Sequence, residues 1–277
     1  MPLRLQLRYP HRPAESHILF EGKDYLLGRA DDCDIIIDDP QVSRYHARLE
    51  ARTGNWTLID HNSQNGCFSG SDRINKLHLA RRAEITLGPV NCYFEQVPHR
   101  QVTAESSFRQ WRSRFVDTAT EQLFRETSLN RLLMSATETL STILSSDRAA
   151  VIFLDEQGDI SRCSGFPQWM NGEQFTGSRT AIQQALSTNA PVVLSKVSAD
   201  PLLSHAKSVI KNHIQALLCY PVTYRDQVVA VLYADSTAEQ RSFLDTDLVI
   251  VRAFARQLSM ALQVQDLERR LSTLQAI

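Results

Sequence analysis

The chain has 277 residues, of which 43% are hydrophobic and 22% are charged. These proportions are those of a globular protein, and the length corresponds to about two domains of roughly 150 residues. Thirty lysines and arginines against 31 aspartates and glutamates give a net charge of -1. This balance argues against a chain built to coat nucleic acid or an anionic membrane, so we expect neither as a direct partner.

No apolar run approaches the roughly 18 residues that a membrane helix needs, and residues 2–9 alternate polar and apolar without a signal-peptide core. The cysteines are odd in number, far apart and without a CxxC pair: Cys33, Cys67, Cys92, Cys163 and Cys219. That spacing fits neither a disulfide framework nor a zinc site. We therefore expect a cytoplasmic protein with no bound metal.

The first hundred residues carry the signals of short strands. Apolar alternation or β-branched runs predict strands at residues 3–7, 25–27, 34–38, 56–60 and 85–87. Turn-forming residues separate these runs, for example Asn65-Gly66 and Ser69-Gly70. Many short strands without a helical period predict an all-β sandwich.

From residue 103 to 145 the apolar period becomes that of a helix, as Phe108, Trp111 and Phe115 show. The rest alternates, with strands expected at 149–154, 192–194, 214–224 and 227–235, helices at 180–186 and 201–211, and a last helix capped by Asp245. This order predicts an α+β domain on an antiparallel sheet. We place the domains at 1–98 and 128–264, joined by a helical linker at 99–127 and followed by a helical extension at 265–277.

Three motifs follow one another in the first half: Gly28-Arg29, Ser43-Arg44-Tyr45-His46 and Ser63-Gln64-Asn65-Gly66. In these residues and their spacing the first hundred positions resemble the FHA (forkhead-associated) domain, an all-β sandwich that binds phosphothreonine peptides. The chain departs from the family pattern at residues 83–84, where Ala-Glu replaces the usual Gly-Asp before the last strand. That turn is distant from the expected phosphate site.

The residue types suit a phosphate dianion. Arg29 offers a permanently charged fork and Ser43 a short hydroxyl donor, and we expect both to converge on one phosphate, with Arg44 as a second positive contact. Taken alone, Ser43-Arg44 is also compatible with a capped turn, and an isolated Asn65-Gly66 is more often just a hairpin turn.

The resemblance assigns roles to the neighbouring residues. Asn65 is expected to pair with the peptide backbone through its amide, and His46 to brace the binding loops. Gly28 and Gly66 are expected to supply backbone conformations closed to residues with a Cβ. Gln64 stands where the family often has Thr, which affects the groove that selects residues after the phosphothreonine.

Residues 129–262 resemble a GAF domain. The likeness is carried by Ile-Gln-Ala-Leu-Leu-Cys-Tyr-Pro-Val at 214–222, by the strand at 228–235 and by Phe-Leu-Asp-Thr-Asp at 243–247. GAF domains often hold a small molecule between the sheet and the helices of one face. Here the signature of the cyclic-nucleotide type is missing at residues 195–200. Cys163 lacks the neighbouring His that bilin-binding relatives have. Cys219 lies within an apolar strand, and we expect it to be a core residue. Two alternatives therefore stay open for this domain: that it binds an unidentified small ligand, or that it is a dimerisation module without a ligand.

The last helix carries apolar residues at intervals of four and three: Met260, Val264, Leu267, Leu271 and Leu274. This seam predicts a coiled-coil-like helix and a parallel homodimer, because the helix extends past the end of its own domain. The alternative is that the stripe is buried on its own domain.

No catalytic motif is present, so we do not expect an enzyme. The sequence predicts a bacterial phosphothreonine-dependent signalling or adaptor protein, which docks a phosphorylated partner through the first domain and senses or relays through a dimeric second domain. The alternative is the regulatory N-terminal portion of a transcription activator or a nucleotide cyclase.

Overall fold

The computed structural model describes residues 1–10, 12–52, 54–126, 128–153, 177–195, 197, 200, 203–225, 227–238 and 241–275, with side chains up to residue 272. The chain divides into two compact units. The first contains Met1–Pro10 and Ala14–Phe108, and Arg109–Ile277 make up most of the second.

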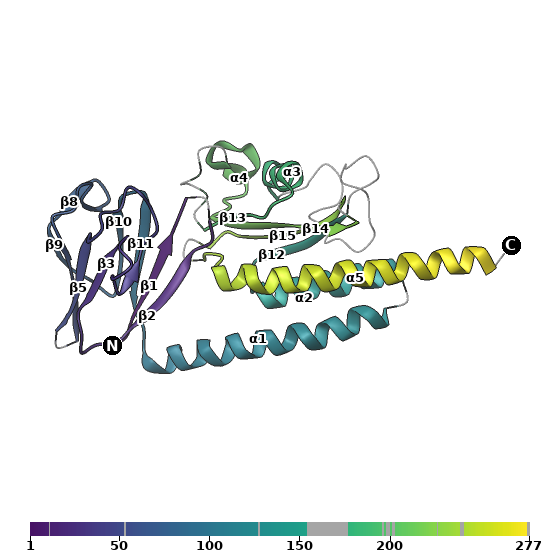
Figure 1. Ribbon diagram of the computed structural model, residues 1–277, viewed down its shortest axis with the longest axis horizontal. Helices are drawn as coiled ribbons and strands as arrows, with labels where there is room; N and C mark the ends of the chain where they lie inside the picture. The colour runs from purple at the N-terminus through teal and green to yellow at the C-terminus, as the bar shows by residue number, and fades with distance from the viewer. Residues whose placement is uncertain are drawn as a thin grey trace. The chain divides into compact units, whose positions relative to one another are not determined.

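The first unit is a sandwich of two sheets (Figure 1). One sheet has the strand order β2 (Glu15–Leu19), β1 (Leu3–Arg8), β11 (Val90–Gln96), β10 (Arg82–Leu87), β7 (Cys67–Ser69) and β8 (Asp72–Ile74). The other has the order β4 (Ile35–Ile36), β3 (Tyr25–Gly28), β5 (Ala47–Arg52), β6 (Asn55–Asp60) and β9 (Lys76–His78). The predicted all-β architecture is confirmed.

A single hydrophobic cluster fills the space between these sheets. Leu3, Leu5 and Leu7 are fully buried, as expected for alternate residues of a strand whose one face packs on the core. Trp56 is fully buried as well and donates its indole N–H to the Met1 carbonyl at 2.9 Å.

The helical period at 103–145 is divided between two helices, α1 (His99–Arg125) and α2 (Leu129–Leu144). Ser128 begins α2, because its Oγ accepts a hydrogen bond from the Arg131 N–H at 3.4 Å. Ser145, with φ 47°, ends it in the left-handed conformation.

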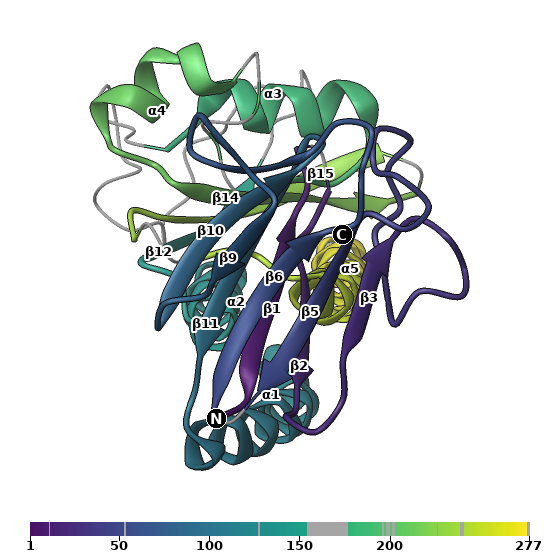
Figure 2. The same ribbon diagram turned by 90° about the vertical axis from the view of Figure 1, so that its left-hand side faces the viewer.

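The second unit is built on an antiparallel sheet with the strand order β12 (Arg148–Phe153), β15 (Gln227–Ser236), β14 (Ala216–Tyr224) and β13 (Val192–Leu194). The helices α2 and α5 (Asp245–Gln275) cover one face. The opposite face carries α3 (Arg179–Thr188), α4 (Lys207–Lys211) and the short 3-10 helix Leu203–His205 (Figure 2). The predicted α+β domain with an antiparallel sheet is confirmed.

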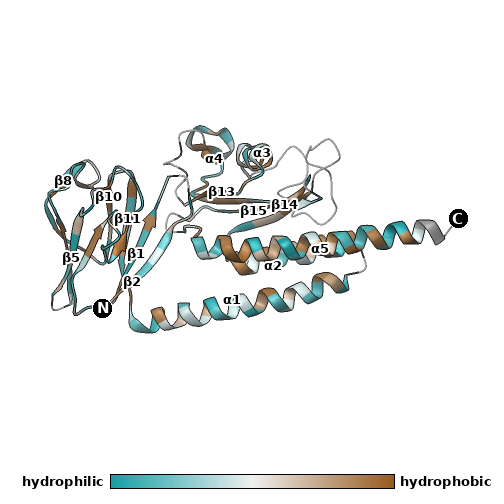
Figure 3. Cartoon of the chain, in the orientation of Figure 1, coloured by the Kyte–Doolittle hydropathy of each residue, from teal (hydrophilic) through white to brown (hydrophobic). Residues whose placement is uncertain are grey.

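The helix α5 leaves an apolar stripe in contact with solvent. Hydrophilic and hydrophobic residues alternate along it (Figure 3). Met260, Val264, Leu267 and Leu271 are 52%, 39%, 52% and 58% exposed, and the side chain of Leu274 lies outside the described residues. A coiled coil through this stripe stays a prediction. Among the described residues, no helix has both the length and the apolarity that crossing a membrane would require.

Candidate functional site

Two loops of the first unit approach each other at the end of β3. The Arg29 N–H donates to the Ser43 carbonyl at 3.1 Å, and the Ala30 N–H donates to the Arg44 carbonyl at 3.2 Å. A Cβ on Gly28 would lie 2.1 Å from the Arg44 carbonyl oxygen. Close backbone approach, rather than a positive φ, is therefore what requires glycine at position 28, whereas Gly66 has φ 77°.

His46 joins the loop that contains Ser43 to a third loop, which contains Gly66. The imidazole is fully buried, and its Nδ1 accepts a hydrogen bond from the Ser43 N–H at 3.0 Å. Its Nε2 therefore carries the ring proton and donates to the Gly66 carbonyl at 3.1 Å. Burial lowers the pKa of His46, against an opposing effect of the Gly66 carbonyl. The residue is thus a neutral brace between the segments that contain Ser43 and Gly66.

Two further hydrogen bonds join the same segments. The Gln64 N–H donates to Ser43 Oγ at 3.0 Å, and Asn65 Nδ2 donates to the Gln41 carbonyl at 2.7 Å. Ser43 keeps its own hydroxyl proton for a ligand, since its oxygen is the acceptor here. Asn65 keeps its side-chain carbonyl and a second N–H, which are the groups needed to pair with a peptide backbone.

A polar cleft of about 220 Å³ opens between the loops, and Arg29, Pro40, Gln41, Val42, Ser43, Arg44 and Gln64 line it. The structure thus brings together four of the predicted contact residues. Asn65 does not line the cleft but is tied to it through Gln41. Arg29 and Arg44 are exposed, and neither guanidinium has a hydrogen-bond or ion-pair partner within the described part of the chain. Two unpaired guanidiniums beside a hydroxyl form a site for a dianion.

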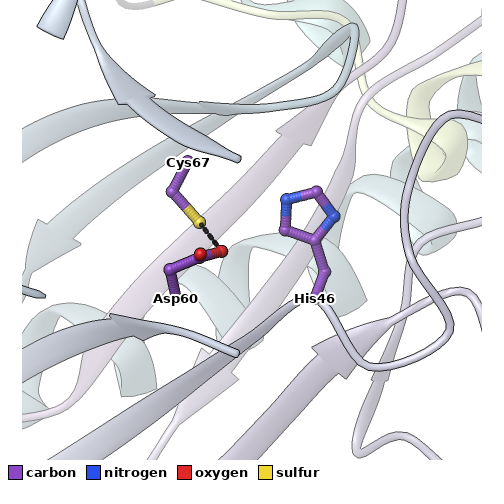
Figure 4. Close-up of side chains that lie close together, drawn as sticks. All are labelled: His46, Asp60 and Cys67. Carbon is purple, nitrogen blue, oxygen red and sulfur yellow. Dashed lines mark hydrogen bonds between the residues drawn. The ribbon is translucent and has the colours of Figure 1, made fainter. Parts of the chain in front are cut away.

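Asp60 and Cys67 lie beneath the loops, beside His46 (Figure 4). One ligand-type atom of each of the three residues lies within 4.8 Å of the others. Asp60 Oδ1 accepts from Ser63 Oγ at 2.5 Å and from Cys67 Sγ at 3.4 Å. Burial, followed by the charge of Asp60, raises the pKa of the Cys67 thiol, so the thiol stays protonated. The group therefore supports the loop. Asp60 and Cys67 belong to β6 and β7 of different sheets, so they meet only when the sandwich packs, and no sequence motif marks them.

The second unit contains a buried polar network on the face of the sheet toward α3. Asp235 accepts hydrogen bonds from Arg148 Nε at 2.6 Å and Nη2 at 2.7 Å, and from Tyr233 Oη at 2.5 Å. The Ser178 N–H, at the start of α3, donates to Tyr233 Oη at 2.9 Å. Burial raises the pKa of Asp235, and the hydrogen bond from Arg148 opposes this. No motif in the sequence marks this network.

The thiol of Cys219 is fully buried and belongs to the hydrophobic cluster between the sheet and the helices α3 and α4. It is a core residue, as predicted. The bilin alternative concerned Cys163, which lies outside the described residues.

A second cleft, of about 670 Å³, lies on the side of α2 and α5. Its apolar wall consists of Leu129, Phe153, Tyr224, Val229 and Leu262, and charged residues of α5 form its rim. The cleft can accommodate an apolar group, and no signal in the sequence analysis pointed to it.

Comparison with known proteins matches residues 25–88 to the FHA domain and residues 128–262 to the GAF domain. The glycogen accumulation regulator GarA of Mycolicibacterium smegmatis is 31% identical over 81 residues, which are 29% of this chain and 51% of the relative. The oxoglutarate dehydrogenase inhibitor of Corynebacterium diphtheriae is 28% identical over 85 residues, 31% of this chain and 59% of the relative. The chain thus spans about half the length of the curated relatives it matches.

Solved structures resemble the first unit as well. One comes from a structural and functional study of phosphothreonine-dependent FHA domain interactions; it is 26% identical, has a TM-score of 0.33, and the match covers 35% of this chain and 99% of that one. The FHA-1 domain of Rv1747 from Mycobacterium tuberculosis is 26% identical with a TM-score of 0.30, over 34% of this chain and 97% of that one. On the family matches, this chain contains an FHA domain followed by a GAF domain.

Proposed function

We propose that the protein is a signalling adaptor that docks a partner phosphorylated on threonine through its FHA domain. FHA domains bind phosphothreonine-containing partners, and the cleft at Arg29, Ser43 and Arg44 has the charge and the donors for the phosphate. The observation that carries the proposal is the pair of exposed guanidiniums without a partner among the described residues, beside a hydroxyl whose proton is uncommitted.

In this arrangement Arg29 and Arg44 hold the phosphate oxygens, and Ser43 donates its hydroxyl proton to a third. Asn65 pairs with the peptide backbone through the side-chain groups that its bond to Gln41 leaves free. The hydrogen bonds of His46 hold the loops of Ser43 and Gly66 in a fixed relative position. The phosphate contact of Ser43 and the peptide-backbone contact of Asn65 are therefore made at the same time. The protein then acts by binding in the cytoplasm rather than by catalysis.

The test is a fluorescence-anisotropy titration of phosphothreonine peptides and their unphosphorylated counterparts. Arg29→Ala should weaken binding at least thirtyfold, because loss of a desolvated charge contact costs about 2–5 kcal/mol. Arg81→Ala is the matched control, since Arg81 is exposed and precedes β10, at the opposite end of that strand from Leu87, which pairs with Cys67. Equal binding of both peptide forms, or an Arg29→Ala variant that binds like the wild type, would contradict the proposal.

The GAF domain completes the proposal as a relay between two copies of the chain. Support comes from the exposed stripe of Met260, Val264, Leu267 and Leu271 on α5, which has the spacing of a helix–helix seam. A parallel pairing of this stripe brings both C-terminal ends together, as a relay toward an output requires.

A further inference from the structure

We propose that Arg73 gives the phosphopeptide site a second anion-binding position, so that partners with an acidic side chain one to three residues from the phosphothreonine are preferred. The inference rests on the proposed function and adds to it a residue that neither the sequence motifs nor the cleft includes. The anionic group is a carboxylate or a second phosphate.

Arg73 lies against the loop that holds Asn65. It belongs to β8, opposite Phe68 of β7, and its Nη2 donates to the Ser63 carbonyl at 3.3 Å. A Cβ on Gly66 would lie 2.7 Å from Arg73 Nε. The guanidinium thus packs directly on the Ser63–Gly66 backbone, and the glycine makes this contact possible.

The distance from Arg73 to Ser43 Oγ, the hydroxyl expected to contact the phosphate, can be bounded. Ser43 Oγ accepts from the Gln64 N–H at 3.0 Å, and the Ser63 carbonyl of that same peptide group accepts from Arg73 Nη2 at 3.3 Å. With the dimensions of one amide group between them, Ser43 Oγ and Arg73 Nη2 are at most about 9 Å apart. An extended peptide advances about 3.3 Å per residue, so a span of three residues is about 10 Å, which is comparable with the distance from Ser43 Oγ to the guanidinium.

Arg73 forms no ion pair with the described residues of the domain. Other arginines of the first unit form ion pairs, as Arg4 and Arg82 do with Glu95 and Arg48 does with Glu50. Arg73 is exposed and has no carboxylate within ion-pair distance among the residues that the structure describes. Its bond to the Ser63 carbonyl uses one of five N–H donors, which leaves a planar fork that matches a carboxylate or a phosphate.

The experiment measures the affinity of the full chain for phosphothreonine peptides with alanine at all flanking positions, with a single glutamate at each of the three positions on either side, or with a phosphoserine there. We expect the wild type to bind one glutamate peptide about three- to tenfold more tightly than the alanine peptide, and the gain to shrink as salt is added. Comparing the gain in affinity of the phosphoserine peptide with that of the glutamate peptide distinguishes a second phosphate from a carboxylate as the preferred group.

Arg73→Gln should abolish this gain while the alanine phosphopeptide still binds, and Arg73→Glu should favour a lysine at the same position. Arg81→Gln removes an exposed arginine elsewhere and should change nothing. Absence of a glutamate preference in the wild type, its persistence in Arg73→Gln, or equal weakening of every peptide by Arg73→Gln would overturn the inference. Failure of the proposed function is seen separately, because the wild type would then not bind the alanine phosphopeptide.

Discussion

Arg112 of α1 donates a hydrogen bond of 2.5 Å to Asp247 of α5, and both side chains are buried within the second unit. The same carboxylate accepts from the Leu244 N–H at 2.9 Å and lies 3.6 Å from Arg241. The side chain of Asp247 therefore caps the first turn of α5 and also links α5 to α1 through Arg112. The sequence predicts Asp245 as the cap of this helix, whereas in the structure Asp247 accepts the hydrogen bond from the preceding backbone.

The first prediction concerns this pair. Asp247→Ala should lower the free energy of unfolding by about 3–5 kcal/mol, because it removes the buried carboxylate that pairs with Arg112. Glu121→Gln is the control, since the ion pair of Glu121 with Arg125 is exposed and contributes at most about 1 kcal/mol. Urea unfolding followed by circular dichroism compares the variants. A loss no larger than that of the control would contradict the structural role of Asp247.

The second prediction is a pH dependence of the first unit. Burial lowers the pKa of His46 below its ordinary value of 6.5, so the unfolded chain binds a proton that the folded chain does not. The contribution of His46 to stability is therefore full above about pH 7.5 and is lost as the pH falls through about 6.5 toward the folded-state pKa. Thermal melts at several pH values should show a smaller change for His46→Gln than for the wild type. His61→Gln, at an exposed histidine, should keep the wild-type slope.

The third prediction concerns Gly28. A methyl group there would lie 2.1 Å from the Arg44 carbonyl oxygen, so Gly28→Ala must separate the two loops. We expect a loss of about 1–3 kcal/mol of stability and of most phosphopeptide binding. Gly54→Ala is the control: its φ of 83° is unfavourable for alanine, but no atom lies within 4 Å of the added methyl. Unchanged peptide binding by Gly28→Ala would exclude this contact from the architecture of the site.

The fourth prediction concerns the proposed dimer. Replacing Leu267 and Leu271 together with aspartate should shift the chain toward monomer, since each exposed leucine that becomes buried contributes about 1.5–3 kcal/mol. Light scattering at micromolar concentration measures the change. Replacing the exposed Val249 with aspartate tests whether the interface extends to the start of α5. A wild-type chain that is monomeric would contradict the proposal, and a dimer unaffected by both changes would place the interface elsewhere.

The sequence predicted the parts of the fold that depend on local pattern. The alternation at residues 3–7 and the two long runs at 214–224 and 227–235 correspond to β1, β14 and β15. The strands β7, β8 and β9 have three residues each, which is too short for a period to be recognised. The site residues around the cleft were predicted because the FHA motifs mark them.

Contacts between distant residues could not be predicted. In α1 the pattern drew attention to Phe108 and Trp111, both of which are exposed, whereas the structure buries Arg112 and Val116 on another face. The burial of a charged residue depends on a partner 135 positions away, and a helical period contains no information about it. Asp60 and Cys67 are only seven residues apart, but they belong to different sheets and meet only when the two sheets pack, which no local pattern predicts.

The cross-links between the two FHA loops have a consequence for timing. The bonds of Ser43 to Gln64, of Gln41 to Asn65 and of His46 to Gly66 are made within the protein itself. Loops that are already held in place lose little conformational freedom when a peptide binds. In the proposed function, binding of the phosphopeptide would then be limited by diffusion and by attraction to Arg29 and Arg44 rather than by ordering of the loops. The proposed adaptor would therefore bind its partner as soon as the threonine is phosphorylated and release it once the phosphate is removed.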